Sequence, residues 1–275
     1  MADIADWLPR ASENSTADGA AATNIAEGSL ASAANNAMRA IIAGVAKFHR
    51  KVFFFDDFVA GAIDARISST AGSGTGNAAL TVVANSTNGT ATLTSASDVS
   101  SHATQASTVT LDQLNFRADQ GGMAMEVRLS IDVITDVAVF VGFTDVISTT
   151  VELPVFKASA SDDLDSDADN AVGVGFDTQG TTDEWWHGGV KATADTAAVH
   201  SGAAPVGGTS YIIRVEVSAA GAVVGYIDDV AIGASTANAV TITTPLTPCI
   251  TIANRGAATR IATVDFLYAQ QSRIA

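Results

Sequence analysis

An aromatic pair beside acidic and imidazole side chains is the most distinctive chemical feature of the sequence. The stretch Thr182–Gly189 (TDEWWHGG) holds two of the three tryptophans, Trp185 and Trp186, between Glu184 and His187. An exposed indole beside a carboxylate can stack a sugar ring and hold its hydroxyl groups. Adjacent strand residues point to opposite faces, so one indole could instead pack in a core while the other stays outside. These four residues are therefore a predicted carbohydrate site, with core packing as the competing interpretation.

An acidic run could bind a cation through alternate carboxylates. Asp163, Asp165 and Asp167 are spaced two residues apart, and Ca²⁺ prefers carboxylate oxygens as ligands. An EF-hand loop counted from Asp163 would need glycine at its sixth position and glutamate at its twelfth, where this chain has Ala168 and Val174. The EF-hand is excluded, and two interpretations stay open: a looser Ca²⁺ site on the three aspartates, or a solvated loop that charge repulsion keeps extended. No other cofactor is expected.

Recognisable catalytic motifs are missing from the sequence. It contains no G-x-S-x-G, H-E-x-x-H or G-x-x-x-x-G-K-[ST], and its four histidines are far apart. Retaining glycosidases need two carboxyl groups about 5–5.5 Å apart, and acids spaced by two or four residues along one strand face help to supply them. Asp183 and Glu184 are adjacent and should diverge. We therefore expect a protein that is not an enzyme.

The composition excludes several classes of partner. The 275 residues include 14 Lys and Arg against 29 Asp and Glu, which gives a formal net charge of −15. Nucleic acids and anionic membranes are bound largely through positive charge, so neither is an expected partner. The sequence has no long apolar run that predicts a membrane span. The single cysteine, Cys249, cannot form an internal disulfide, and the first residues lack the features of a secretory signal, so we expect synthesis in a cytoplasm.

From Lys51 onward the sequence has the pattern of β-structure. Apolar residues alternate with polar ones from Met123 to Val133 and, with one exception, from Tyr211 to Ser218, which predicts strands with one buried and one solvated face. About eleven short strands separated by Gly, Asn and Ser turns favour an antiparallel β-sandwich of jelly-roll type over residues 51–275. The expected strands span residues 52–58, 80–84, 90–94, 108–116, 122–133, 137–143, 171–177, 211–218, 222–228, 249–253 and 260–268.

Residues 1–50 have a different character and form a predicted separate segment. Residues 1–30 are small and polar with no clear period, which indicates an extended lead. A helix with heptad spacing follows, and it either lies as a single amphipathic helix on the domain behind it or associates with two copies of itself. The positions of this predicted seam are Ala34, Met38, Ile41, Val45 and Phe48.

The N-terminal segment resembles the opening segment of tailed-bacteriophage tail-fibre and related appendage proteins. The resemblance is carried by Trp7, by Asn24–Gly28 (NIAEG) and by Asn35–Ala40 (NNAMRA). The chain departs from the family pattern at Leu30 and Ala31, where a proline commonly follows Glu-Gly. In that family the segment docks the protein on the particle. The resemblance therefore implies attachment to other virion proteins through Trp7, Leu8, Ile25, Glu27 and Leu30.

The remainder resembles the concanavalin-like jelly rolls of phage appendages. The cues are Phe55–Phe58 (FDDF), Ile227–Val230 (IDDV) and Val264–Tyr268 (VDFLY). Together the two resemblances imply a non-enzymatic virion protein, made in the host bacterial cytoplasm, that forms a short fibre or spike, contacts host-surface glycans and is a homotrimer. A capsid decoration protein (head fibre or cement) and a glycan-degrading enzyme on the same fold are the alternatives. A bacterial carbohydrate-binding module is a third class, disfavoured by the missing signal.

Overall fold

The computed structural model describes residues 51–59, 61–86, 89–97, 106–147 and 153–272. Residues from Phe53 to Ser272 belong to one compact unit. The described part contains no helix that is long and apolar enough to cross a membrane. All of the predicted attachment and seam residues lie outside the described residues: Trp7, Leu8, Ile25, Glu27, Leu30, Ala34, Met38, Ile41, Val45 and Phe48.

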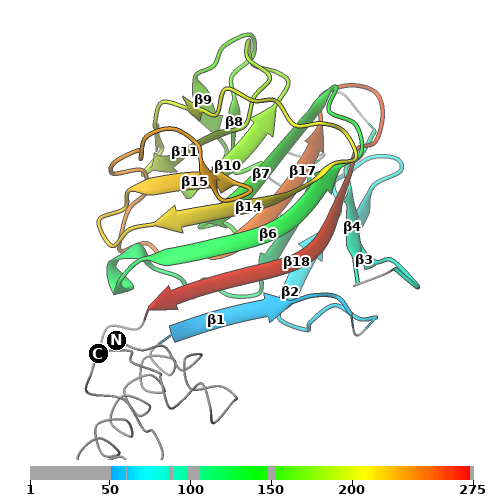
Figure 1. The fold of residues 1–275 in the computed structure, drawn as a ribbon, viewed down its shortest axis with the longest axis horizontal. Helices are drawn as coiled ribbons and strands as arrows, with labels where there is room; N and C mark the ends of the chain where they lie inside the picture. The colour runs from blue at the N-terminus through cyan, green and yellow to red at the C-terminus, as the bar shows by residue number, and fades with distance from the viewer. Residues whose placement is uncertain (1–50, 60, 87–88, 98–105, 148–152, 273–275) are drawn as a thin grey trace, which may run out of the picture. The chain divides into compact units, whose positions relative to one another are not determined.

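The predicted antiparallel β-sandwich is confirmed. Two sheets of eight strands each, called sheet A and sheet B, pack face to face, and β14, β6 and β18 lie in front of β10, β7 and β17 in Figure 1. Sheet A has the order β16-β15-β14-β6-β18-β4-β3, with β1 also paired to β18. Sheet B has the order β12-β11-β10-β7-β17-β5-β2, with β13 paired to β11. A separate hairpin is formed by β8 and β9.

The elements have the following bounds. Sheet A contains β1 (Lys51–Asp56), β3 (Ala78–Val82), β4 (Ala91–Thr94), β6 (Met123–Ile131), β14 (Ser210–Val217), β15 (Val223–Ile227), β16 (Val230–Ala231) and β18 (Ile261–Ser272). Sheet B contains β2 (Ile67–Thr70), β5 (Ser107–Leu111), β7 (Val137–Thr144), β10 (Asn170–Asp177), β11 (Trp186–Lys191), β12 (Ala194–Asp195), β13 (Val199–His200) and β17 (Thr247–Asn254). The hairpin strands are β8 (Val155–Lys157) and β9 (Leu164–Ser166), and one short 3₁₀ helix, η2, spans Ala118–Gln120.

Sheet A is buried on one face only, as the alternating pattern predicts. In β6 every second residue from Met123 to Ile131 is buried, and the intervening residues are partly or fully exposed. The strand ends at Ile131, so Val133, expected to be its last inward residue, is instead 44% exposed. The outer face of β6, at the centre of sheet A, is therefore polar and open to solvent.

Sheet B is buried on both faces, which the sequence analysis did not anticipate. Every residue of β7, β10 and β17 is buried. Val174 faces sheet A, because a side chain at Gly225 of β15 would collide with it. Its neighbour on β10, Gly175, therefore faces outward in one row with Phe140 and Trp186.

The outer face of sheet B is covered by a second apolar core. Residues of the β8–β9 hairpin region, including Phe156 and Leu164, pack in one buried cluster with outward residues of sheet B such as Phe140 and Trp186. Both of these rings lie over glycine: a Cβ at Gly175 would come within 2.2 Å of the Trp186 indole. The glycines of β10 thus leave room for large aromatic rings close to the sheet beneath the hairpin.

Candidate functional site

The predicted carbohydrate site is not an exposed aromatic surface. Trp185 is 2% exposed and Trp186 is 0% exposed. Trp186 packs against Phe140 beneath the hairpin. Trp185 lies between Phe176 and Tyr211, with ring centroids 5.8 Å away in both cases. The expectation that one indole stays outside is wrong, because the hairpin covers the face of sheet B that would otherwise be solvated.

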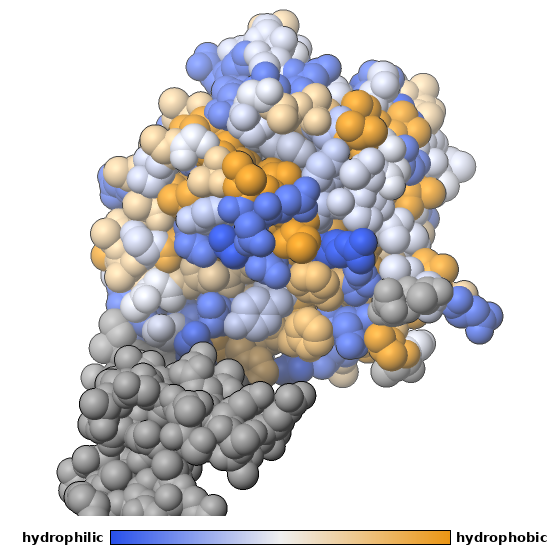
Figure 2. Space-filling view, viewed as in Figure 1, coloured by the Kyte–Doolittle hydropathy of each residue, from blue (hydrophilic) through white to orange (hydrophobic). Residues whose placement is uncertain are grey.

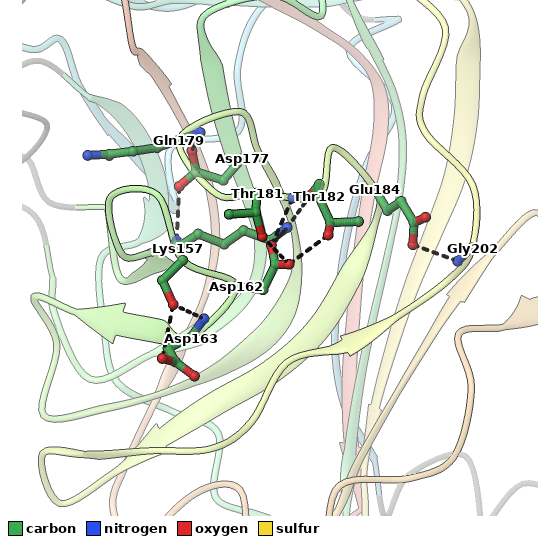
Figure 3. Close-up of polar contacts among 10 residues, drawn as sticks. Lys157, Asp162, Asp163, Asp177, Gln179, Thr181, Thr182, Glu184 and Gly202 are labelled. Carbon is green, nitrogen blue, oxygen red and sulfur yellow. Dashed lines mark hydrogen bonds and ion pairs between the residues drawn. The ribbon is translucent and has the colours of Figure 1, made fainter.

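The other two residues of the predicted carbohydrate site point to different places. His187 is fully buried and lies on the inner face of β11, next to the position of Gly225. Burial lowers the pKa of His187 to about 4, against the opposing effect of the Ala234 and Ile232 backbone carbonyls. Glu184 is partly exposed and accepts a hydrogen bond of 3.0 Å from the Gly202 N–H (Figure 3). The four residues therefore do not converge on one ligand surface.

The three aspartates of the acidic run do not form a cation site. Asp163, Asp165 and Asp167 are exposed along and beside β9, while Leu164 between them is buried in the outer core. Asp163 accepts a hydrogen bond from the Ser161 hydroxyl at 2.9 Å. Within the described ranges, no three His, Cys, Asp or Glu side chains are grouped so that they could hold a metal ion. As the structure places them, these three side chains therefore do not form the looser Ca²⁺ site.

Asp162, just before these aspartates, has a structural partner instead. Its carboxylate accepts hydrogen bonds from Lys157 Nζ at 3.0 Å and from the hydroxyls of Thr181 and Thr182 at 2.5 and 2.6 Å (Figure 3). Burial opposes ionisation of Asp162, but these hydrogen bonds outweigh it and hold the pKa of Asp162 well below its usual value. Lys157 is 0% exposed, so the pair fastens the hairpin to the loop before β11.

The open outer face of sheet A carries a transverse row of four side chains that we call the sheet A row. Arg214 of β14 lies opposite Tyr226 of β15 and, on its other side, opposite Glu126 of β6. Glu126 in turn lies opposite Tyr268 of β18. The row therefore crosses four neighbouring strands, with a tyrosine at each end and an ion pair in the middle.

Arg214 is held in a fixed orientation within this row. Its guanidinium lies 4.3 Å from the centroid of the Tyr226 ring. Its Nε is 3.2 Å from Glu216 Oε1, and its Nη1 is 2.8 Å from Asp229 Oδ1 and 4.0 Å from Glu126 Oε2. These side chains stay accessible, since 27% of the arginine and 31% of Glu126 remain exposed. The row thus presents a flat aromatic and guanidinium surface rimmed by hydrogen-bond acceptors.

A second charged pair lies beside the row and joins β6 to β18. Arg128 Nη1 is 2.6 Å from Asp265 Oδ2, and Phe266 lies opposite Arg128. Burial and the nearby charge of Glu126 raise the pKa of Tyr268, so its phenol remains a neutral O–H donor. Figure 2 shows hydrophilic residues gathered over the middle of this face with apolar areas beside them.

The sequence analysis missed the sheet A row. Its signal was present as two short polar alternations, Glu126-x-Arg128 and Arg214-x-Glu216, together with tyrosines in two other strands. Taken by themselves, those alternations indicate only the solvated face of a sandwich. Which of these residues become neighbours depends on strand order and register, and local periodicity does not determine either.

Comparisons with known proteins show the fold and no closer relationship. No protein-family model matches the chain, and no curated protein matches it. A prokaryotic β-1,3-1,4-glucanase (lichenase) from a mouse hindgut metagenome is similar at 12% identity and a TM-score of 0.51, over 81% of this chain and 100% of that chain. The Crh5 transglycosylase is similar at 14% identity and a TM-score of 0.51, over 81% and 85%. A protein of unknown function from Shewanella oneidensis MR-1 is similar at 15% identity and a TM-score of 0.51, over 84% and 94%. The chain therefore has the lectin-like and glucanase-like β-sandwich fold.

Proposed function

We propose that this chain is a non-enzymatic structural protein of a tailed-bacteriophage particle, a short fibre or spike, whose sheet A row contacts host-surface glycans. The observation that carries the glycan contact is the row itself, in which Tyr226 and Tyr268 flank Arg214 and Glu126 on an open face. Solved structures that share the fold include, by their names, a glucanase and a transglycosylase. The fold therefore also occurs in proteins that are named for an action on glycans.

The charge of the face indicates the class of glycan. Two arginines, Arg128 and Arg214, stand among four carboxylates, those of Glu126, Glu216, Asp229 and Asp265. The face is thus net negative in a chain of net charge −15, and an acidic polysaccharide would be repelled. A neutral or amino-bearing glycan suits the row, since its hydroxyls can pair with carboxylates while its apolar ring face stacks on tyrosine.

Replacing Arg214 with alanine should weaken glycan binding about tenfold, because the Tyr226 ring loses the group that orients it. Arg66→Ala is the matched control, since Arg66 also stacks over a ring, that of Phe54, at 4.8 Å and pairs with Asp64 at 2.7 Å, away from the row. Binding would be screened on an array of neutral and anionic oligosaccharides and measured by calorimetry. An equal loss in both variants, or no binding by the wild type, would refute the glycan contact.

A glycan-degrading enzyme is the second candidate, because two carboxylates share the exposed face on neighbouring strands. Glu126 and Glu216 both approach Arg214, at 4.0 and 3.2 Å. A glycosidase of this type needs one carboxyl group that keeps its proton to act as the acid, whereas both of these are engaged by the same guanidinium. We therefore favour the non-enzymatic role. If the wild type released reducing sugar from a glycan and the Glu126→Gln variant did not, the enzyme would be favoured instead.

The virion location is supported by the resemblance of residues 1–50 to phage attachment segments. A chain that begins at Lys51 is expected to keep a cooperative unfolding transition, since the cores of the sandwich are built from residues 53–272, and to be missing from assembled particles. Circular dichroism would follow the unfolding of the shortened chain. Gel analysis of purified particles would show whether that chain is incorporated. Incorporation at normal occupancy would refute attachment through residues 1–50, and a position on the capsid would favour the decoration protein.

We also propose that the chain is a homotrimer. The heptad spacing from Ala34 to Phe48 supports a three-helix seam, and appendage proteins of the resembled family are commonly three-fold. A surface of high negative charge opposes random association, so assembly has to depend on apolar contacts.

A further inference from the structure

A β-bulge turns over the second half of β18. Asp265 is the extra residue, because Val264 and Phe266 lie opposite consecutive residues of β6. Before the bulge the even-numbered residues of β18 are buried, and after it the odd-numbered residues of 267–271 are buried. A bulge re-aims the side chains that follow it, and such bulges are frequent beside functional sites. In this strand the bulge directs Phe266 and Tyr268 to the outer face of sheet A.

The bulge completes the sheet A row. In an uninterrupted register Tyr268 would lie opposite the buried Met125 and would point into the sandwich. The extra residue places Tyr268 opposite Glu126 instead. The row therefore has a partly exposed tyrosine at each end, Tyr226 on β15 and Tyr268 on β18. Figure 1 shows the four strands of the row side by side, in the order β15, β14, β6 and β18.

The two tyrosines are separated by three strand spacings. Neighbouring strands lie roughly 4.7–4.9 Å apart, so the separation is about 14 Å. Between the tyrosines lie Arg214 and Glu126, which can donate to and accept from sugar hydroxyls. One sugar unit of an extended glycan advances by about one strand spacing. A single sugar can therefore stack on only one tyrosine, and four consecutive units are needed to reach both.

We infer that the sheet A row binds four consecutive units of a linear β-1,4-linked glycan that runs across the strands. This inference rests on the proposed glycan contact and names the class of glycan. The outer two units stack on Tyr226 and Tyr268, and the inner two hydrogen-bond to Arg214 and Glu126. The linkage follows from the shape of the row, because β-1,4-linked units continue in a nearly straight line, whereas α-1,4-linked units coil.

The test is calorimetric titration of the full chain with β-1,4-linked glucose and N-acetylglucosamine oligomers of two to six units. In at least one of these series the affinity should rise about tenfold between three and four units, where the second tyrosine is reached, and only slightly beyond four. Oligomers of α-1,4-linked glucose of the same lengths are the control ligands and should lack this step. If neither β-1,4-linked series shows the step, the inference is wrong.

Two variants locate the step in the structure. Tyr268→Ala should remove the step and leave most of the affinity for the trisaccharide, which can still stack on Tyr226. Phe266→Ala is the matched control and should keep the step, because Phe266 is directed outward by the same bulge but lies opposite Arg128, outside the row. A melting curve checks that each variant is folded. Persistence of the step in a folded Tyr268→Ala variant would overturn the inference.

The outcomes separate this inference from the proposed function. If the trisaccharide and the hexasaccharide bind equally well and both bind more weakly to Arg214→Ala, the row contacts glycan and only the four-unit inference fails. If no member of either β-1,4-linked series binds, the inference fails as well. The screen of neutral and anionic oligosaccharides then decides the glycan contact by itself.

Discussion

Replacing Asp177 with alanine is expected to lower the free energy of unfolding by about 3–5 kcal/mol, the usual effect of leaving a buried charge without its partner. Asp177 is 1% exposed and Arg255 is 7% exposed in their side chains. One carboxylate oxygen accepts hydrogen bonds from Arg255 Nε at 3.0 Å and the Gln179 N–H at 2.9 Å. The other accepts from Arg255 Nη2 and, at 3.0 Å, from the Lys157 N–H. The aspartate thus joins β10, the end of β17 and the covering hairpin. Figure 3 shows its contacts with Lys157 and Gln179.

Chemical denaturation of Asp177→Ala and of a control variant would measure this effect. Asp119→Ala is the control, because the Arg117–Asp119 pair is 38% and 23% exposed, and exposed pairs contribute at most about 1 kcal/mol. Equal losses of unfolding free energy in the two variants would show that the Asp177 network does not hold the hairpin on sheet B.

Acidification is expected to destabilise the protein through His187. The side chain is fully buried, and within the described residues neither ring nitrogen has a hydrogen-bond partner of regular geometry. Burial lowers the pKa of His187 to about 4 from 6.5. Above pH 6.5 the imidazole is neutral in the folded and in the unfolded chain, so His187 does not make the stability depend on pH there. As the pH falls from 6.5 to 4 the unfolded chain binds a proton that the folded chain does not, so about 3 kcal/mol of stability is lost.

The His187→Gln variant isolates this contribution. Its free energy of unfolding should vary less with pH between 6.5 and 4 than that of the wild type, whatever its absolute stability. The same substitution at His200, in the neighbouring strand β13 and partly exposed, is measured alongside it. Identical slopes for the wild type and His187→Gln would show that His187 is not the group that takes up the proton on unfolding.

The sandwich could be predicted because the alternation of apolar and polar residues along the chain indicates strands with one buried face. The alternation in Met123–Val133 corresponds to β6, and its one error is at Val133, where the strand has already ended. The predictions at Trp185 and Trp186 failed because they assumed a solvated outer face. The uninterrupted burial of Val137–Thr144 and Asn170–Asp177 has a sequence signal. Residues 137–143 and 171–176 are all apolar or glycine, without polar alternation, which is typical of strands covered on both sides.

The sheet A row could not be predicted from the chain alone. Its residues come from four strands spread between Glu126 and Tyr268, and they meet because β15, β14, β6 and β18 are neighbours in that order. A shift of one residue in any register would move a member of the row to the inner face. Strand order and register follow from packing of the whole sandwich, so the three-dimensional structure was needed to bring these residues together.

The central claim, that the outer face of sheet A is the glycan-contacting surface, is tested most directly by a crystal structure with a bound neutral oligosaccharide selected on the array. The account predicts a sugar ring stacked on Tyr226 or Tyr268, with its hydroxyls hydrogen-bonded to Glu126 or Arg214, and the hairpin still closed over Trp186. A sugar bound against sheet B after displacement of the β8–β9 hairpin, or bound at a loop away from the sheet A row, would contradict it.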